Sequence, residues 1–243
     1  MASGRSAAVQ PVVDDLQRIF GDRLEAVVVY GWRQSGAVPS LALVRSLTLE
    51  DLNACAARSV AWHRAGAATP LLLTRAEFAR SLDAFPIEYG EIIEHHEIVL
   101  GDDPFDGLSI GRDDLRRACE VQIKSHLLHL REDYVEGAGR TAEIESLVRE
   151  SAPGFAAVLR HLARLDGADG TTAAHLVRYA AQRIRLDAHV VGDLLALSDS
   201  EGLPTVDAVR LFPAYLAAME RAADFVDQWR ESEGGRGLYP ATP

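Results

Sequence analysis

The first hundred residues alternate between helical and strand-like patterns of apolar positions. One helical face runs through Val12, Val13, Leu16, Ile19 and Phe20. Residues 24–30 contain an Ala-Val-Val-Val-Tyr run that is typical of a buried strand, and shorter strands are predicted over residues 41–44, 70–73 and 85–89. This alternation predicts a small α/β domain over residues 1–110.

Two helices in this half are marked by their first residues. Thr48 with Asp51 resembles a capping box, in which a side chain and a backbone amide hydrogen-bond reciprocally, and opens a helix towards Arg64. Thr74 with Glu77 repeats the arrangement. Local chemistry therefore predicts both starting points.

Beyond this region the strand pattern disappears. An apolar stripe of about five helical turns contains Leu115, Cys119, Ile123, Leu127, Leu130 and Tyr134. Gly137 and Gly139 are expected to end that helix. Further helices are predicted over residues 142–151, 153–165, 173–183, 188–197 and 206–229.

Pro213 either kinks the last of these helices or marks its true start. Short connections between the helices predict a bundle over residues 111–233. The Gly/Pro-rich tail, 234–243, is expected to be flexible. The fold class expected is α+β, with a small mixed-sheet domain followed by an all-α bundle.

Composition narrows the functional classes. A hydrophobic content of 48% and a charged content of 25% are those of an ordinary globular protein. The net charge of −11 opposes extended nucleic-acid binding, which needs a basic face. No apolar run approaches the roughly 20 residues that cross a bilayer, and residues 1–10 lack a secretory core. Cys55 and Cys119 lie in apolar helical patterns without CxxC spacing, so we expect a cytoplasmic protein with buried free thiols.

The order of elements carries a family resemblance. The first strand ends in Val-Val-Val-Tyr30-Gly31, and a downstream segment contains Phe85-Pro86-Ile87-Glu88-Tyr89, Glu94-His95-His96 and Leu100-Gly101-Asp102-Asp103-Pro104-Phe105. An α/β half of this kind followed by a helical bundle resembles the nucleotidyltransferase superfamily. The minimal and the aminoglycoside (kanamycin-type) nucleotidyltransferases are examples.

The resemblance implies a definite active site. In that superfamily the first strand ends in a Gly-Ser turn, the second strand carries Asp-x-Asp, and a later strand supplies a third acid. The carboxylates hold divalent metal ions that clamp the triphosphate and activate the attacking hydroxyl. The glycine turn lets backbone amides approach the phosphates.

This chain departs from that pattern at the metal ligands. Trp32 stands where the family has Ser, and Ser40-Leu41-Ala42-Leu43-Val44 stands where the Asp-x-Asp pair belongs. No acid occurs between Glu25 and Glu50. The resemblance therefore implies the architecture without the usual metal site, and no metal or other cofactor is expected.

The nucleotide-binding residues implied by the resemblance are those of the turn, Gly31, Trp32, Arg33, Ser35 and Gly36. Arg33 would bind an anion without metal, and Trp32 would stack on a base. In a plainer interpretation, which we favour, Trp32 fills the space left by a shortened loop and Arg33 is solvated.

Glu88 is the one catalytic candidate, because it lies roughly where the third carboxylate would come. Alone it could not hold two magnesium ions. An active enzyme that uses Mg²⁺ would need a displaced acidic set, such as Glu88, Glu91 and Asp102 or Asp103, to converge on the Gly31 turn.

The histidines add two weaker candidates. On a helix over residues 91–96, Glu91 and His95 would share a face and bind a metal or exchange a proton, although an ordinary surface pair explains them better. His126 and His129 flank the apolar stripe, where interdomain polar packing is the simpler interpretation. No metal site is predicted from these residues.

Three functions follow. The first is a nucleotidyltransferase-fold protein without metal-dependent transfer, which acts as a module for binding a nucleotide or small anion or for interaction. The second is an active nucleotidyltransferase with the displaced acids. The third is a helical-bundle homodimer paired through alanine-rich faces at Ala217, Ala218, Ala222 and Ala223.

Overall fold

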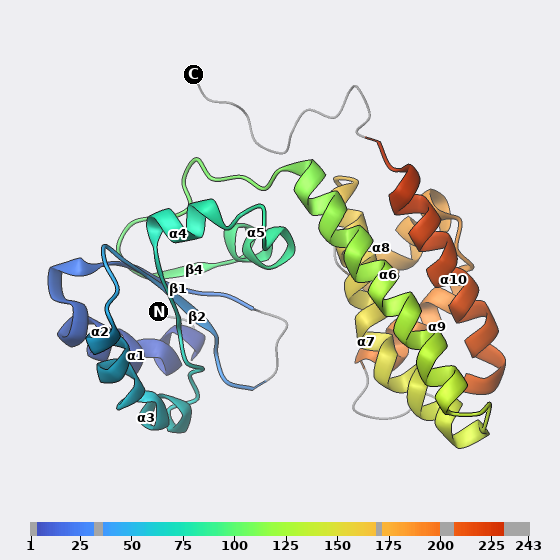
Figure 1. Cartoon of the computed structure of the whole chain (residues 1–243), viewed down its shortest axis with the longest axis horizontal. Coiled ribbons are helices and arrows are strands. Elements are labelled where there is room, and N and C mark those ends of the chain that lie inside the picture. The colour runs from blue at the N-terminus through green and yellow to red at the C-terminus, as the bar shows by residue number, and fades with distance from the viewer. Residues whose placement is uncertain (1–3, 32–35, 169–171, 200–206, 231–243) are drawn as a thin grey trace. The chain divides into compact units, whose positions relative to one another are not determined.

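A computed structural model describes residues 4–31, 36–168, 172–199 and 207–230 (Figure 1). The chain divides into two compact units, Met1–Gly111 and Arg112–Pro243. All the strands of the described residues lie in the first unit, and the described part of the second is helical. The tail predicted to be flexible, 234–243, lies outside the described residues. None of the described helices is both long and apolar enough for a membrane span.

The first unit is a mixed sheet between two layers of helices. Its elements are α1 (Gly4–Phe20), a 3-10 turn (Gly21–Arg23), β1 (Leu24–Val29), β2 (Ser40–Val44), α2 (Leu49–Ala56), α3 (Ser59–Arg64), β3 (Leu71–Thr74), α4 (Arg75–Arg80), α5 (Pro86–Glu94) and β4 (Glu97–Leu100).

The four strands have the order β3-β2-β1-β4. β1 pairs antiparallel with both neighbours, and Val29 lies opposite Ser40 on β2 and opposite Glu97 on β4. β2 pairs in parallel with β3. The mixed sheet expected from the apolar runs is therefore present, and three of its strands fall where the sequence predicts them.

Both faces of this sheet are buried. Val27, Val29 and Ala42 contribute to one core, which α1 and Trp62 of α3 complete. Val28, Leu41 and Leu43 face the opposite core, which contains the aromatic residues Phe78, Tyr89 and Phe105. Figure 1 shows α1–α3 on one side of the sheet and α4 and α5 on the other. Because both sides are covered, β1 and β2 read as continuous apolar runs.

The capping boxes at Thr48 and Thr74 are confirmed. The Thr48 hydroxyl accepts a hydrogen bond from the Asp51 amide at 3.2 Å, and the Thr48 amide donates to the Asp51 carboxylate at 3.0 Å. Thr74 and Glu77 make the same reciprocal pair. The helix expected to run from Thr48 to residue 64 is interrupted, however, and forms α2 and α3.

The predicted strand over residues 85–89 is wrong. These residues begin helix α5, where Pro86 occupies the first turn and needs no amide donor there. The helix expected over 91–96 is the second part of α5, which ends at Glu94. The fourth strand, β4, comes after it and was not predicted.

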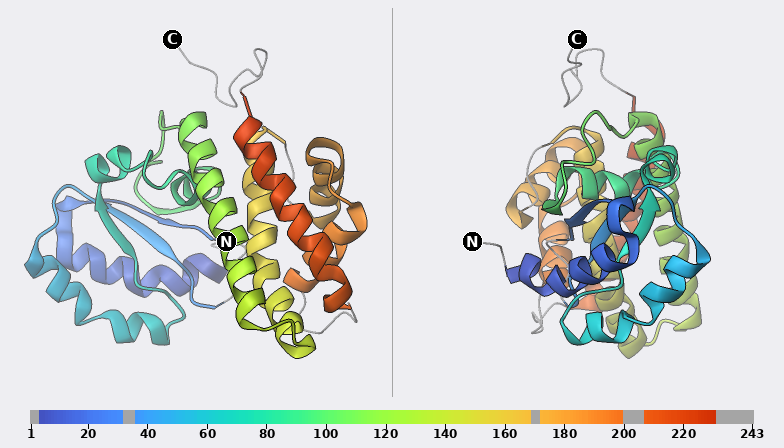
Figure 2. Two further views of the ribbon diagram at one scale, coloured as in Figure 1. Left: turned by 45° about the vertical axis from the view of Figure 1, so that its right-hand side comes forward. Right: turned by 90° about the vertical axis from the view of Figure 1, so that its left-hand side faces the viewer.

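The second unit is a bundle of helices. Its elements are α6 (Arg112–Glu136), α7 (Thr141–Leu165), α8 (Ala173–Tyr179), a π-helical turn (Ala180–Ile184), α9 (Ala188–Asp199) and α10 (Ala208–Gln228). Figure 2 shows α6, α7 and α10 side by side.

Residues 141–165 form one helix where the sequence predicts two. Pro153 lies inside α7 and leaves the carbonyl of Arg149 without its usual helical donor. Gly154 allows this part of α7 to lie close to α6, because a Cβ there would be 2.7 Å from the imidazole of His126. Phe155 and Leu159 on the following turns of α7 are fully buried, and this burial offsets the weakened turn.

Helix α10 begins at Ala208, so Pro213 lies inside it rather than at its start. Ala218, Ala222 and Ala223 are buried, and α10 packs on α6 and α7 of the same unit. Close packing within the chain therefore accounts for most of the alanine-rich face that suggested a dimer. Ala217 remains exposed.

His161 on α7 gives the bundle a predicted pH dependence. Its Nδ1 donates to the side-chain oxygen of Gln122 at 2.6 Å, and burial lowers its pKa to about 4. An unfolded histidine has a pKa of about 6.5, so the unfolded chain takes up a proton that the folded chain does not. We expect stability to fall as the pH drops from about 6.5 to about 4, by about 3 kcal/mol in total.

Urea unfolding followed by circular dichroism at several pH values measures this dependence. His161→Gln should flatten the stability profile between these two pH values. An equally steep profile in that variant would show that other groups cause the loss.

Candidate functional site

The predicted nucleotide-binding turn begins where β1 ends. Tyr30 and Gly31 follow the strand, and Gly31 has a φ of 69°, which favours glycine. Gly36 also has a positive φ, of 103°. Trp32, Arg33 and Ser35 lie outside the described residues.

Arg5 on the first turn of α1 holds the start of this turn. Its Nη2 donates to the carbonyl oxygens of Tyr30 and Gly31, each at 3.0 Å. Burial raises the pKa of Tyr30, and the nearby Tyr89 raises it further. The start of the turn therefore combines the guanidinium of Arg5 with the half-buried, neutral phenol of Tyr30.

The acid that the strands bring beside this turn is Glu97. It lies opposite Val29, two residues before Gly31, and its carboxylate accepts a hydrogen bond from the hydroxyl of Ser6 on α1. The short apolar run Ile98-Val99-Leu100 directly after Glu97 is the sequence feature that indicates this strand.

Glu88, the predicted remnant of the acidic set, is not on a strand. It lies in the first turn of α5 and is exposed. A carboxylate there interacts favourably with the helix dipole, which gives Glu88 a structural role. Its expected position on a later strand was wrong because residues 85–89 are helical.

The second strand offers no position for a metal ligand. An Asp-x-Asp pair would put two side chains on one face of β2, because alternate residues share a face. Leu41 and Leu43 face the aromatic core, and Ala42 and Val44 face the α1 core. Ser40 is the one polar residue of β2, and its buried hydroxyl has no hydrogen-bond partner among the described residues.

Asp102 and Asp103 lie at the wrong end of the sheet for the displaced acidic set. They follow Gly101, whose Cα lies against the backbone of Glu25 at the start of β1. Six residues of extended chain, or roughly 20 Å, separate Glu25 from Gly31. Asp103 instead accepts a hydrogen bond from the amide of Phe105 at 2.9 Å, which stabilises its own loop. These acids do not converge on the Gly31 turn.

The histidines have structural contacts. His95 follows the end of α5, and its amide donates to the Glu91 carbonyl at 2.9 Å. His126 is hydrogen-bonded to the Tyr215 hydroxyl at 2.6 Å inside the bundle, and His129 lies 3.5 Å from Glu132 on its surface. No group of three or more potential ligands among the described residues could hold a metal ion.

His96 has a structural role that the sequence pattern did not indicate. Its Nδ1 donates to the carbonyls of Ile92 and Ile93, both at 3.1 Å, at the end of α5. Its Nε2 faces Asp103 at 3.6 Å. This imidazole ties α5 to the loop after β4.

The two cysteines are unreactive. Both are free and buried. Burial raises the pKa of each thiol, that of Cys119 to about 12, so neither is a thiolate nucleophile at neutral pH.

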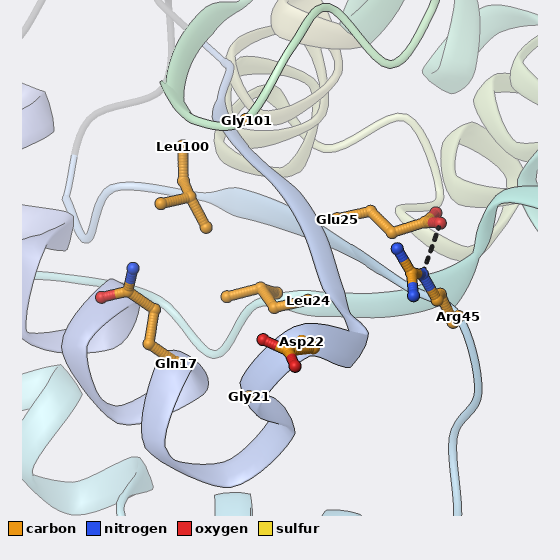
Figure 3. A pocket seen from close by; sticks show the side chains of 8 residues that line it. All are labelled: Gln17, Gly21, Asp22, Leu24, Glu25, Arg45, Leu100 and Gly101. Atoms are coloured by element: carbon orange, nitrogen blue, oxygen red, sulfur yellow. Dashed lines mark ion pairs between the residues drawn. The ribbon is translucent and has the colours of Figure 1, made fainter.

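A depression of about 580 Å³ lies at the end of the sheet opposite the Gly31 turn (Figure 3). It is lined by Gln17, Gly21, Asp22, Leu24, Glu25, Arg45, Leu100 and Gly101. The carboxylate of Glu25 points towards Arg45 at 3.6 Å and is also 3.8 Å from Arg75. The lining combines the carboxylates of Asp22 and Glu25 with the guanidinium of Arg45, so charge of one sign is not concentrated in this depression.

The turn end of the sheet therefore remains the better candidate. Its described residues combine a glycine turn, a guanidinium and a single carboxylate, with apolar packing where metal ligands would be needed. A scan against protein-family models gives no match for this chain, and no curated protein matches it.

Proposed function

We propose that this chain is a nucleotidyltransferase-fold protein that does not carry out metal-dependent nucleotidyl transfer. It acts instead as a module for binding a nucleotide or small anion, or for interaction. The single observation that carries the proposal is the burial of β2 on both faces. A carboxylate pair on this strand would lie in one of two hydrophobic cores, where unpaired charge is strongly disfavoured.

The arrangement around the turn supports an anion-binding function without metal. The glycine at position 31 allows the backbone to adopt a positive φ. Arg5 places a permanent positive charge beside the carbonyl groups of Tyr30 and Gly31. Among the described residues, Glu97 is the one acid that the strands place beside the turn, and one carboxylate does not hold the pair of ions that phosphoryl chemistry requires. A cytoplasmic location belongs to the same proposal and is supported by the two free thiols.

Purified protein incubated with labelled nucleoside triphosphates, Mg²⁺ or Mn²⁺ and a panel of small-molecule and protein acceptors tests the proposal. We expect no labelled product above the level of a heat-denatured sample. Calorimetric titration with ATP should give the same affinity in EDTA as in Mg²⁺, because no protein carboxylates organise the metal.

Two variants make this test decisive. Glu97→Gln removes the carboxylate beside the turn, and Glu88→Gln removes the predicted remnant of the acidic set, which is exposed on α5. Transfer that is present in the native chain and lost in either variant would overturn the proposal. It would also identify which of the two carboxylates serves the active alternative, in which a displaced acidic set binds Mg²⁺.

A further inference from the structure

The loop after β4, residues 101–111, carries the chain from the first unit to the second. We call it the linking loop. Phe105 anchors it in the aromatic core of the first unit, and the Pro104 carbonyl accepts a hydrogen bond from Nη1 of Arg75 at 2.8 Å. His96, between α5 and β4, contacts both Phe105 and Asp103 of this loop (Figure 1). Imidazole is the side chain that commonly changes its charge between pH 5 and 8, so His96 can make this anchorage depend on pH.

The hydrogen-bond partners of His96 determine which ring nitrogen carries the hydrogen. Nδ1 lies 3.1 Å from each of the carbonyl oxygens of Ile92 and Ile93 at the end of α5. Because a carbonyl oxygen only accepts hydrogen bonds, Nδ1 is the nitrogen that carries the hydrogen in the neutral ring. Nε2 then presents a lone pair, and it faces the Asp103 carboxylate at 3.6 Å. In the neutral state two hydrogen-bond acceptors therefore face each other.

We propose that His96 is a proton-dependent clasp, which holds the linking loop more tightly on α5 in mild acid than at neutral pH. A proton taken up at Nε2 turns this nitrogen into a charged donor that faces Asp103, and the two acceptors become an ion pair. Nδ1 keeps its hydrogen and its bonds to the carbonyls of α5. These carbonyls lie at the C-terminus of the helix, where a positive charge is favoured. The clasp lies within the first unit and does not depend on the function of the Gly31 turn.

The surroundings of the ring leave Asp103 as the group that responds to the proton. Phe105 packs edge-on against the imidazole, with 4.8 Å between the ring centroids, and carries no charge. On α4, Arg75 is directed to the Pro104 carbonyl, and the Glu97 carboxylate of β4 accepts a hydrogen bond from Ser6 on α1. The other charged or titratable side chains close to His96 and Asp103 in the chain are exposed, and they are Glu94, His95, Asp102 and Asp106.

The amide of Phe105 is a direct reporter of the clasp. It donates at 2.9 Å to Oδ1 of Asp103, the same oxygen that faces Nε2 of His96. Local opening of the loop breaks this hydrogen bond and exposes the amide to hydrogen exchange. The Asp103 side chain is 50% exposed, so the new ion pair is partly screened by water. We expect it to slow the exchange of the Phe105 amide by about threefold.

Hydrogen exchange followed by NMR on the full chain tests the clasp, at about pH 5.5 and about pH 7.5 with EDTA present. Each rate is divided by that of an unstructured amide at the same pH, which gives a protection factor. In the native chain the protection factor of the Phe105 amide should be about threefold higher at the lower pH.

Two variants identify the groups responsible. Asp103→Asn keeps an oxygen that accepts the Phe105 amide but removes the charge, so its protection should be equal at both pH values. His95→Gln is the matched control, because it removes the exposed histidine next to His96, and it should keep the difference seen in the native chain.

Nitrogen-15 NMR of the imidazole tests the starting state independently. At about pH 8 the hydrogen of the neutral His96 ring should lie on Nδ1. A hydrogen on Nε2 would overturn the proposal, since the neutral ring would then already donate to Asp103.

Two exchange results would also overturn it. One is a native chain whose Phe105 amide is equally protected, or less protected, at the lower pH. The other is a difference that persists in Asp103→Asn, since the carboxylate would then have no part in it. The predicted effect of His161 cannot imitate the clasp, because acid weakens the second unit through that residue and would lower protection.

Discussion

Replacing Gly101 with alanine is expected to destabilise the first unit by more than about 3 kcal/mol. Gly101 has a φ of 80°, a conformation that costs an alanine about 1–2 kcal/mol. A Cβ at this position would also lie 2.2 Å from the carbonyl oxygen of Glu25. This oxygen belongs to the backbone of β1, so the overlap can be relieved only by moving β4 away from β1.

The measurement is urea unfolding, with hydrogen exchange followed by mass spectrometry to locate the weakened region. Gly107→Ala is the control, because Gly107 has a φ of 76° but no atom within 4 Å of the point where a Cβ would lie. It should show the conformational cost alone. Equal losses in the two variants would mean that the close approach of Gly101 to β1 contributes nothing.

Replacing Asp15 with alanine is expected to cost about 2–4 kcal/mol. The side chain of Asp15 on α1 is only 6% exposed. Its carboxylate accepts hydrogen bonds from the indole nitrogen of Trp62 at 3.0 Å and from Nε of Arg58 at 2.9 Å, and it contacts Arg18. Alanine would leave the fully buried Trp62 with an unsatisfied N–H group.

Asp15→Asn separates the charge from the hydrogen bonds, because the amide keeps one acceptor oxygen at similar size. We expect it to lose less stability than Asp15→Ala in thermal and urea unfolding. If the two variants are equally stable, the hydrogen bond to Trp62 makes no measurable contribution.

Acid titration gives a second measurement on Asp15. Burial by itself would raise the pKa of this carboxyl, but the hydrogen bonds from Arg58 and Trp62 outweigh it and hold the pKa below its ordinary value. The folded chain therefore releases this proton more readily than the unfolded chain. The resulting stability is fully present above about pH 4 and is lost as the pH falls below it. Asp15→Asn should reduce this loss.

The two units depend on their buried polar groups in opposite ways. In the first unit, Asp15 must keep its charge, so acid weakens the packing of α1 on α3 by protonating a carboxylate. In the second unit, His161 must stay neutral, so acid weakens α7 by charging an imidazole. The histidine effect begins near pH 6.5 and the aspartate effect near pH 4, which allows them to be separated in one titration.

Local patterns were sufficient to predict several elements of this protein. Residues 24–30 and 41–44 had to be buried strands because both faces of β1 and β2 are covered, and such strands read as apolar runs. The capping boxes at Thr48 and Thr74 need only residues three apart, so no tertiary information was required. The lack of acidic residues on β2 also needs no tertiary information, because it concerns only the identity of residues 40–44.

Contacts between segments that are distant in the sequence could not be predicted from such local patterns. The short segment over residues 85–89, with Glu88 among its apolar residues, suits a strand or a helix equally, and the aromatic core that contains Tyr89 favours the helix α5. Glu97 reaches the Gly31 turn only because β4 pairs with β1 across about 70 residues of chain. Gly101 is restricted by the backbone of Glu25 and Gly154 by the ring of His126, and neither neighbour is near in sequence. The sequence by itself determined the buried strands β1 and β2 and the capped starts of α2 and α4, because these depend on neighbouring residues, whereas packing in three dimensions decided the remaining elements and which side chains share a site.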